Sequence, residues 1–310
     1  MPENPSSTTP TTTPAAPDMA SLARPSGAFA MLAMDQRVSL ETMFRNNGRD
    51  TSSGTLDGFR GLVLDAAAPY VSAILLDSGY LSRAGVGSWA ADATGLIVAV
   101  DDLEQPAGMP AQDSTIDREA VQLAVPLQAD ALKLLIIWLS EAGDEKHAQQ
   151  AAMAAEFVAL AHAQGMLALV EVIGHGGVRP GDRPMTADEL LEAAEVLGRG
   201  ADIYKAQVPI HGGDSAQDVE RLAREMTATV QVPWVVLSTG VSDERFPELV
   251  GASCRGGASG FLAGRAIWSR AVPATTTEET IAILQSSATD LGRLSAIVDA
   301  EARPYTEVIR

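Results

Sequence analysis

The sequence predicts an α/β protein, a (β/α)₈ (TIM) barrel with an extra C-terminal helix. About eight apolar segments alternate with helical stretches over about 250 residues, which is the usual size of that fold. The segments are apolar along their whole length, as expected for parallel strands that are buried on both faces. An open doubly wound sheet would instead carry a glycine-rich fingerprint after an early strand. The glycines of Gly85-Val-Gly87 and Gly174-His-Gly-Gly177 do not lie in that context.

The predicted strands are short runs of aliphatic residues, and the predicted helices carry apolar residues at helical spacing. The strands cover residues 28–35, 70–77, 94–101, 131–138, 166–172, 203–207, 234–238 and 260–263. Helices are predicted at 57–68, 116–128, 145–164, 186–197, 216–228 and 243–254, with two more at 277–285 and 291–308. The helix at 186–197 opens on Thr186-Ala-Asp-Glu189, which has the pattern of a capping box.

The chain is predicted to form one domain behind an N-terminal tail. Residues 1–23 are rich in Ser, Thr, Pro and Ala, and this composition indicates a disordered segment. The tail lacks the basic and apolar regions of a secretory signal peptide. Residues 24–310 carry the whole strand–helix alternation and are predicted to form a single (β/α)₈ domain.

Composition and charge exclude several classes of partner. The formal net charge of −18 would repel nucleic acid and anionic membranes, so we expect neither as a partner. No apolar run approaches the roughly 18 residues of a membrane span. The four histidines form no zinc-binding pattern, and we expect no metal and no cofactor. The single cysteine, Cys254, excludes a disulfide framework and suits a cytoplasmic protein. We also expect the protein to form a homo-oligomer.

Two of the three lysines lie inside apolar strand segments. Lys205 lies in the strand at 203–207 and Lys133 in the strand at 131–138, whereas Lys146 lies in a polar run. Burying an ammonium without a partner is costly, and a desolvated lysine that sheds its proton becomes a nucleophile. The alternative is that the buried lysines extend to solvent or pair with Asp130 or Asp202.

Polar residues mark the C-terminal ends of the predicted strands, where the chemistry of such barrels takes place. The first strand ends in Asp35-Gln36-Arg37, and Lys133, Glu171 and Lys205 lie on the fourth, fifth and sixth strands. Two cations in one pocket disfavour each other's protonated form, which predicts a neutral amine able to attack a ketone. A salt bridge from Glu171 to either lysine is an alternative that is compatible with this chemistry before substrate binds.

The loops after the last two strands are small and contain glycine. Ser238-Thr239-Gly240 follows the seventh strand and Gly264-Arg265 the eighth. Backbone N–H groups of such loops can approach an anion closely, and Arg265 would add a charge-assisted contact. Either loop alone could be an ordinary tight turn, but the two together predict a phosphate site.

These segments resemble the class I sulfofructosephosphate aldolases, part of a wider group with the tagatose 1,6-bisphosphate aldolases. The resemblance lies in residues 24–37, 72–77, 131–138, 201–205, 233–241 and 257–268, which occur in the family's order. It runs from about Arg24 to near the C-terminus. The phrase Gly260-Phe-Leu-Ala-Gly-Arg265 favours the sulfosugar branch.

The resemblance implies a (β/α)₈ fold and metal-independent cleavage of 6-deoxy-6-sulfofructose 1-phosphate to dihydroxyacetone phosphate and 3-sulfolactaldehyde. It implies Lys205 as the Schiff-base lysine and Glu171 as the proton-transfer residue. Ser238, Gly240, Gly264 and Arg265 would surround the phosphate, with Thr239 in the same loop. We expect Lys133 to assist Lys205 and to contact a substrate hydroxyl.

The far end of the substrate would lie near the first strand. Arg37 is the candidate to bind the sulfonate. The alternative is that it pairs with Asp35 and only stabilises the strand. After Glu171 the family tends to have a proline and then an arginine, whereas this chain reads Val172-Ile-Gly-His-Gly-Gly-Val-Arg179. The alternatives are a tagatose 1,6-bisphosphate aldolase, a phosphate-binding isomerase and a non-catalytic binding barrel.

Overall fold

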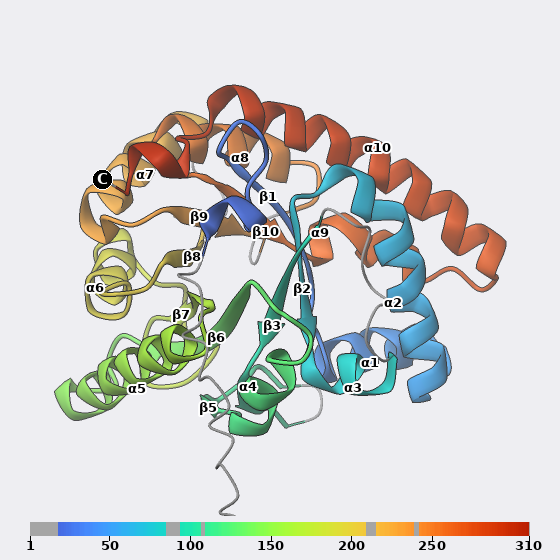
Figure 1. Cartoon of the computed structure of the whole chain (residues 1–310), viewed down its shortest axis with the longest axis horizontal. Helices are drawn as coiled ribbons and strands as arrows, with labels where there is room; N and C mark the ends of the chain where they lie inside the picture. The colour runs from blue at the N-terminus through green and yellow to red at the C-terminus, as the bar shows by residue number, and fades with distance from the viewer. Residues whose placement is uncertain (1–17, 85–93, 107–108, 209–214, 239–241, 310) are drawn as a thin grey trace, which may run out of the picture.

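The computed structural model describes residues 18–84, 94–106, 109–208, 215–238 and 242–309, and its centre is a closed barrel of parallel strands (Figure 1). Around the barrel the order is β1-β2-β3-β6-β7-β8-β9-β10, with β10 pairing back onto β1. The (β/α)₈ fold predicted from the sequence is therefore confirmed. The barrel strands are β1 (Phe29–Met34), β2 (Ala73–Asp77), β3 (Gly95–Ala99), β6 (Ala131–Leu139), β7 (Leu167–His175), β8 (Ile203–Gln207), β9 (Trp234–Leu237) and β10 (Gly260–Ala263).

A small antiparallel hairpin, β4 (Asp101–Glu104) and β5 (Asp113–Ile116), lies between β3 and β6 in the chain. The sequence did not predict it. A single residue, Val100, separates β3 from β4, so the apolar pattern at 94–101 predicts one strand where the structure has the end of one and the start of another. The hairpin brings Asp101 to the C-terminal end of the barrel.

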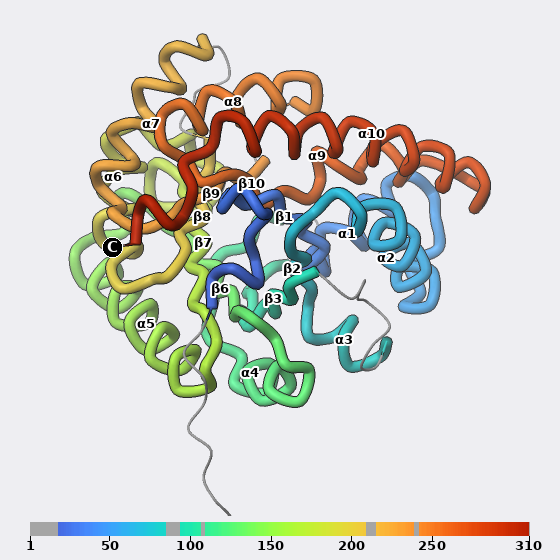
Figure 2. Tube along the Cα trace, turned by 45° about the horizontal axis from the view of Figure 1, so that its top comes forward, coloured from blue at the N-terminus to red at the C-terminus, as the bar shows by residue number. Residues whose placement is uncertain are grey.

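Helices surround the barrel, and most of them lie where helical periodicity predicts them (Figure 2). Short helices after β1, β2 and β10 were not predicted. The helices are α1 (Val38–Asn46), α2 (Ser53–Ala67), α3 (Ser78–Ala84), α4 (Arg118–Ala124), α5 (Asp144–Ala163), α6 (Ala187–Leu197), α7 (Ala216–Val230), α8 (Phe246–Arg255), α9 (Arg265–Trp268) and α10 (Thr277–Glu301). The capping box at Thr186 and Glu189 is confirmed.

The C-terminal region differs from the prediction of two helices at 277–285 and 291–308. Helix α10 is continuous over 25 residues, and a short 3₁₀ helix, η4 (Tyr305–Glu307), follows it. Apart from Ala288, residues 286–290 are poor helix formers. Leu284, Ala288 and Leu291 are nevertheless buried, and α10 packs along α2 and α8. Burial of the apolar face therefore outweighs local propensity.

Side chains that point into the barrel form an aliphatic core. Above it lies a layer of charged residues, here called the charged layer, which includes Lys133, Glu171 and Lys205. Because side chains alternate along a strand, every second residue faces the interior. The inward positions near the strand starts are apolar, and they include Met31, Leu75, Ile97, Leu169, Ile203, Val235 and Leu262. The same alternation puts Lys133, Glu171 and Lys205 on the inside, two residues beyond Ala131, Leu169 and Ile203.

Residues 18–23, which the sequence analysis assigns to the tail, pack against the barrel. A 3₁₀ helix, η1 (Met19–Leu22), buries Met19 and Leu22 among the inward side chains of the strands. A Cβ at Gly95 would lie only 2.6 Å from the carbonyl oxygen of Ser21, so a glycine there allows η1 to approach β3. Residues 1–17 lie outside the described residues.

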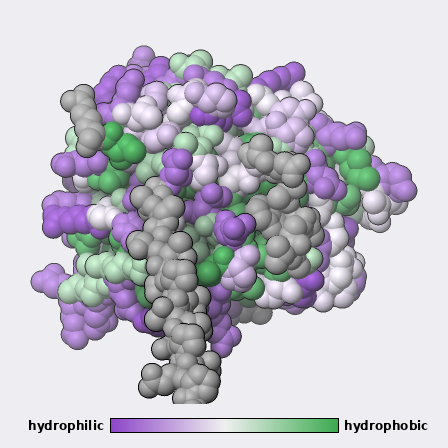
Figure 3. Space-filling model, viewed as in Figure 1, coloured by the Kyte–Doolittle hydropathy of each residue, from purple (hydrophilic) through white to green (hydrophobic). Residues whose placement is uncertain are grey.

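Two further short 3₁₀ helices, η2 (Ala68–Tyr70) and η3 (Ser269–Ala271), complete the described elements. None of the helices in the described part of the chain is long and apolar enough to cross a membrane. The face in Figure 3 is mostly hydrophilic or weakly polar, with only scattered hydrophobic residues.

The packing of η1 leads to a stability prediction. We expect Leu22→Ala to lower the free energy of unfolding by about 2–5 kcal/mol, because it leaves a cavity in the barrel core. Ala20→Ser, at an exposed position of the same 3₁₀ helix, is the matched control and should change little. Urea unfolding followed by circular dichroism measures both. A change below about 0.5 kcal/mol for Leu22→Ala would mean that η1 does not help to hold the barrel together.

Candidate active site

A cavity of about 470 Å³ lies at the C-terminal ends of the barrel strands. Most of the residues predicted from the sequence line it. They are Asp35, Gln36, Arg37, Lys133, Glu171, Lys205, Ser238, Gly264 and Arg265. Two further predicted residues, Thr239 and Gly240, lie outside the described residues. The barrel therefore gathers into one cavity side chains that are more than 200 positions apart in the chain.

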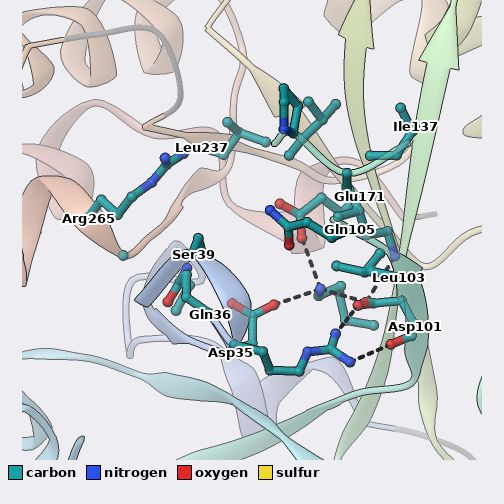
Figure 4. A pocket seen from close by; sticks show the side chains of 18 of the residues that line it. Asp35, Gln36, Ser39, Asp101, Leu103, Gln105, Ile137, Glu171, Leu237 and Arg265 are labelled. Atoms are coloured by element: carbon teal, nitrogen blue, oxygen red, sulfur yellow. Dashed lines mark hydrogen bonds and ion pairs between the residues drawn. The ribbon is translucent and has the colours of Figure 1, made fainter. Parts of the chain in front are cut away.

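The buried ammonium of Lys133 lies among three carboxylates. Its Nζ is 2.6 Å from Asp35 Oδ2, 2.7 Å from Asp101 Oδ1 and 3.3 Å from Glu171 Oε2. Figure 4 shows these three acidic side chains converging on the pocket floor. Burial alone would lower the pKa of Lys133, but the negative charges of Asp101, Asp35 and Glu171 raise it well above its ordinary value. The three carboxylates therefore favour the protonated form of Lys133.

The expectation that two lysines would destabilise each other's charge is wrong for Lys133. The sequence showed one carboxylate between the lysines, whereas the fold brings in Asp35 and Asp101 as well. Among the described residues no group of His, Cys, Asp or Glu side chains is arranged to hold a metal ion. The carboxylates here surround an ammonium instead.

Asp35 is an anion over the whole physiological pH range. Burial alone would raise the pKa of Asp35, but the positive charges of Lys133, Lys205 and Arg37 lower it to about 2. Asp35 lies directly after β1, and β1 lies across the barrel from β7. Asp35 therefore enters the charged layer from the side opposite to Glu171.

Lys205 and Glu171 form a close pair on neighbouring strands. Glu171 on β7 is the register partner of Lys205 on β8, and Lys205 Nζ is 2.8 Å from Glu171 Oε1. The predicted salt bridge is confirmed, and Glu171 contacts both lysines. Neither lysine pairs with Asp130 or Asp202, whose carboxylates accept backbone N–H groups at the starts of β3 and β7.

Arg37 is held by Asp101 instead of Asp35. Its Nη1 donates to the carbonyl oxygen of Asp101 at 2.8 Å, and its Nη2 forms an ion pair with the Asp101 carboxylate. Burial alone would lower the pKa of Arg37, but Asp101, Asp35 and Asp77 raise it. The alternative of an Arg37–Asp35 brace is therefore corrected to an Arg37–Asp101 pair.

Sequence reasoning missed Asp101, which is the central acceptor of the site. Its Oδ1 accepts from Lys133 Nζ at 2.7 Å and from the Leu135 N–H at 3.2 Å, and its Oδ2 accepts from Arg37. The available signal was its position as the last residue of the third predicted strand, like that of Asp35 in the first. A lone carboxylate at a strand end is common and does not by itself indicate a site.

The opposite side of the pocket holds Ser238, Gly264 and Arg265. Figure 4 shows Arg265 across the pocket from Asp101. A Cβ at Gly264 would lie 2.5 Å from the carbonyl oxygen of Ala33 and 2.9 Å from Gln36 Nε2. Glycine at this position thus allows the loop after β10 to pack against the end of β1.

The altered loop after Glu171 does not bring an arginine to the pocket. Arg179 is exposed, and Arg183 pairs with Glu141 and Glu189. Strand β7 instead continues to His175, which lines the pocket and was not predicted. Burial lowers the pKa of His175, which favours its neutral form.

Two solved structures with the same fold are those of fructose-bisphosphate aldolases. The enzyme from Plasmodium falciparum superposes with a TM-score of 0.69 at 14% identity and covers 92% of this chain and 94% of that chain. The enzyme from Slackia heliotrinireducens has a TM-score of 0.60 at 22% identity, with 89% and 86% covered. At these identities the likeness shows the fold alone.

Sequence comparison finds relatives that match over nearly their whole length. Tagatose 1,6-diphosphate aldolase 2 of Streptococcus pyogenes serotype M3 is 24% identical over 309 residues, with 91% of this chain and 94% of that protein covered. Tagatose 1,6-diphosphate aldolase 1 of Streptococcus pyogenes serotype M1 is 25% identical over 314 residues, with 91% and 95% covered.

The family comparison covers the barrel. A model described as DeoC/LacD family aldolase matches residues 29–270, from the first residue of β1 to a position beyond β10. The matched range contains every residue that is described as lining the pocket. The chain therefore belongs to the DeoC/LacD family of aldolases.

Proposed function

We propose that this protein is a Schiff-base aldolase that cleaves 6-deoxy-6-sulfofructose 1-phosphate to dihydroxyacetone phosphate and 3-sulfolactaldehyde. The observation that carries the reaction class is the pair of Lys205 and Glu171, 2.8 Å apart on the floor of a cavity large enough for a sugar phosphate. Family membership supports the same class.

The proposed mechanism begins with proton transfer from Lys205, for which Glu171 lies at hydrogen-bonding distance. The neutral amine attacks the C2 ketone, and Glu171 returns its proton to the departing hydroxyl, which leaves as water. The resulting iminium withdraws electrons from the C3–C4 bond, and Glu171 is again ionised. Glu171 takes the C4 hydroxyl proton, directly or through water, and the C3–C4 bond breaks. The aldehyde leaves, and the resulting enamine is protonated and hydrolysed to release dihydroxyacetone phosphate.

Lys133 has a different role in this proposal from that of a second nucleophile. Its charge is held by three carboxylates, so its lone pair is unavailable for attack on a ketone. The protonated amine instead stabilises the ionised form of Glu171, 3.3 Å away.

The two anions of the substrate would bind on opposite sides of the pocket. We assign the C1 phosphate to Ser238, Gly264 and Arg265, together with Thr239 and Gly240. The sulfonate would then lie near Arg37. Because Asp101 already offsets the charge of Arg37, this side suits a weakly basic monoanion better than a phosphate dianion.

Cleavage of tagatose 1,6-bisphosphate is the second candidate function, because the relatives that match this chain are named as tagatose 1,6-diphosphate aldolases. The same lysine and glutamate would serve, and the second anion would be a phosphate. Cleavage rates for the sulfosugar phosphate and for tagatose and fructose bisphosphates distinguish the two candidates. An isomerase or a non-catalytic barrel would not need Lys205 as a nucleophile.

Trapping with borohydride tests the assignment of Lys205. Incubation with dihydroxyacetone phosphate and borohydride should leave a reduced adduct on Lys205, because reduction makes the iminium permanent. Peptide mapping by mass spectrometry locates the adduct, and Lys205→Met should abolish it. An adduct on Lys133, or none in the wild-type protein, would contradict the proposal.

Substitution of Glu171 separates proton transfer from Schiff-base formation. Glu171→Gln keeps the shape of the side chain but removes the base, and we expect kcat to fall by roughly 10²–10⁴-fold. Borohydride trapping at Lys205 should survive in this variant, because water can take the Lys205 proton in place of Glu171. Steady-state cleavage assays give kcat, and near-normal turnover would show that another group moves the proton.

Substitution of Arg37 tests the site of the second anion. In the condensation direction, Arg37→Ala should lower kcat/KM mainly for 3-sulfolactaldehyde. The loss should correspond to roughly 1.5–3 kcal/mol of transition-state stabilisation, the scale of a charged hydrogen bond. Glyceraldehyde, which lacks the anion, is the control acceptor. Equal losses for both acceptors would mean that Arg37 supports the fold or the chemistry and that the sulfonate binds elsewhere.

A further inference from the structure

Asp101 joins the two cations on one side of the pocket. One carboxylate oxygen accepts from Lys133 and the other from Arg37, while the carbonyl oxygen of the same residue accepts from Arg37 Nη1. The Asp101 side chain has no exposed surface, whereas that of Arg37 is 31% exposed. The negative charge is therefore buried directly behind the cation that faces the pocket.

The charged layer is balanced as a whole. The cations and the carboxylates are equal in number, and the six residues are Arg37, Lys133, Lys205, Asp35, Asp101 and Glu171. Removing the charge of Asp101 would leave one excess positive charge in the layer. Because water does not reach that carboxylate, the change would be felt more strongly than it would at the surface.

We propose that Asp101 determines the charge of the anion accepted beside Arg37, because it offsets the guanidinium and so favours a monoanion over a dianion. The proposal deepens the function proposed above and rests on it. Asp101 uses two of the five N–H groups of Arg37, and three remain that the described residues do not engage. The guanidinium thus keeps donors for a ligand while much of its net charge is offset.

The physical argument depends on the number of charges on the ligand. The Coulomb energy of a dianion changes by about twice that of a monoanion when one unit charge is removed nearby. A sulfonate carries one negative charge, and a phosphate monoester carries two once the pH exceeds its second pKa of about 6. Loss of the Asp101 charge should therefore help both ligands, and the phosphate more.

Asp101→Asn is the test, measured in the condensation direction at pH 8 with dihydroxyacetone phosphate. The readout is the ratio of kcat/KM for glyceraldehyde 3-phosphate to kcat/KM for 3-sulfolactaldehyde. A ratio taken on one enzyme preparation cancels any loss of active protein, so a merely structural role would not change it. We expect the ratio to rise about tenfold, which corresponds to about 1.4 kcal/mol.

Two further comparisons serve as controls for this test. Asp113→Asn removes a half-buried carboxylate from the same hairpin, where it pairs with Lys146, and should leave the ratio unchanged. If Asp101→Asn alone does not fold, Arg37→Gln compared with Arg37→Gln/Asp101→Asn reports the same effect without an uncompensated cation. Adding Asp101→Asn to Arg37→Gln should again raise the ratio about tenfold.

An unchanged or lower ratio upon loss of the Asp101 carboxylate would overturn this inference. Failure of the underlying function has a different signature, because the wild-type protein would then form no borohydride adduct on Lys205. A wild-type preference for glyceraldehyde 3-phosphate would overturn both the sulfonate assignment and the inferred preference for a monoanion, while the aldolase class would stand.

Discussion

The buried ammonium of Lys133 is the constraint on which the rest of the site depends. A charge without access to water must be compensated, and here Asp35, Asp101 and Glu171 provide that compensation from three different parts of the barrel. Removing one partner of a buried pair typically costs about 3–5 kcal/mol, because the other charge is left uncompensated. Strands β1, β6, β7 and the β4–β5 hairpin are thereby fixed relative to one another at their C-terminal ends.

This constraint also gives the two lysines different roles in the proposed mechanism. Three carboxylates keep Lys133 charged, whereas Lys205 has one carboxylate contact among the described residues, from Glu171. In the proposed mechanism Lys205, which has one carboxylate contact, reacts with the ketone, and Lys133, which has three, stays protonated. The difference arises from the barrel geometry, since both lysines lie within similar apolar segments of the chain.

The barrel below the charged layer acts as its support. The aliphatic residues of the strands and the 3₁₀ helix η1 fill the interior from below, so the charged side chains have little room to move. Fructose-bisphosphate aldolases share the same barrel at low identity, so substrate choice must lie in the side chains and loops around the pocket.

The sequence by itself determined the barrel and most of the charged residues of the pocket. Continuous apolar runs predict buried parallel strands, and a lysine or glutamate that interrupts such a run is visible without a structure, as with Lys133, Glu171 and Lys205. Only the tertiary structure decided which charges meet. Asp101 lies 64 residues from Arg37 and 32 from Lys133. The choice of Asp101 over Asp35 as the partner of Arg37 depends on how far the side chain reaches from the end of β1 to the β4–β5 hairpin. Local patterns report burial and periodicity, whereas ion-pair partners are set by the distances that the closed barrel imposes.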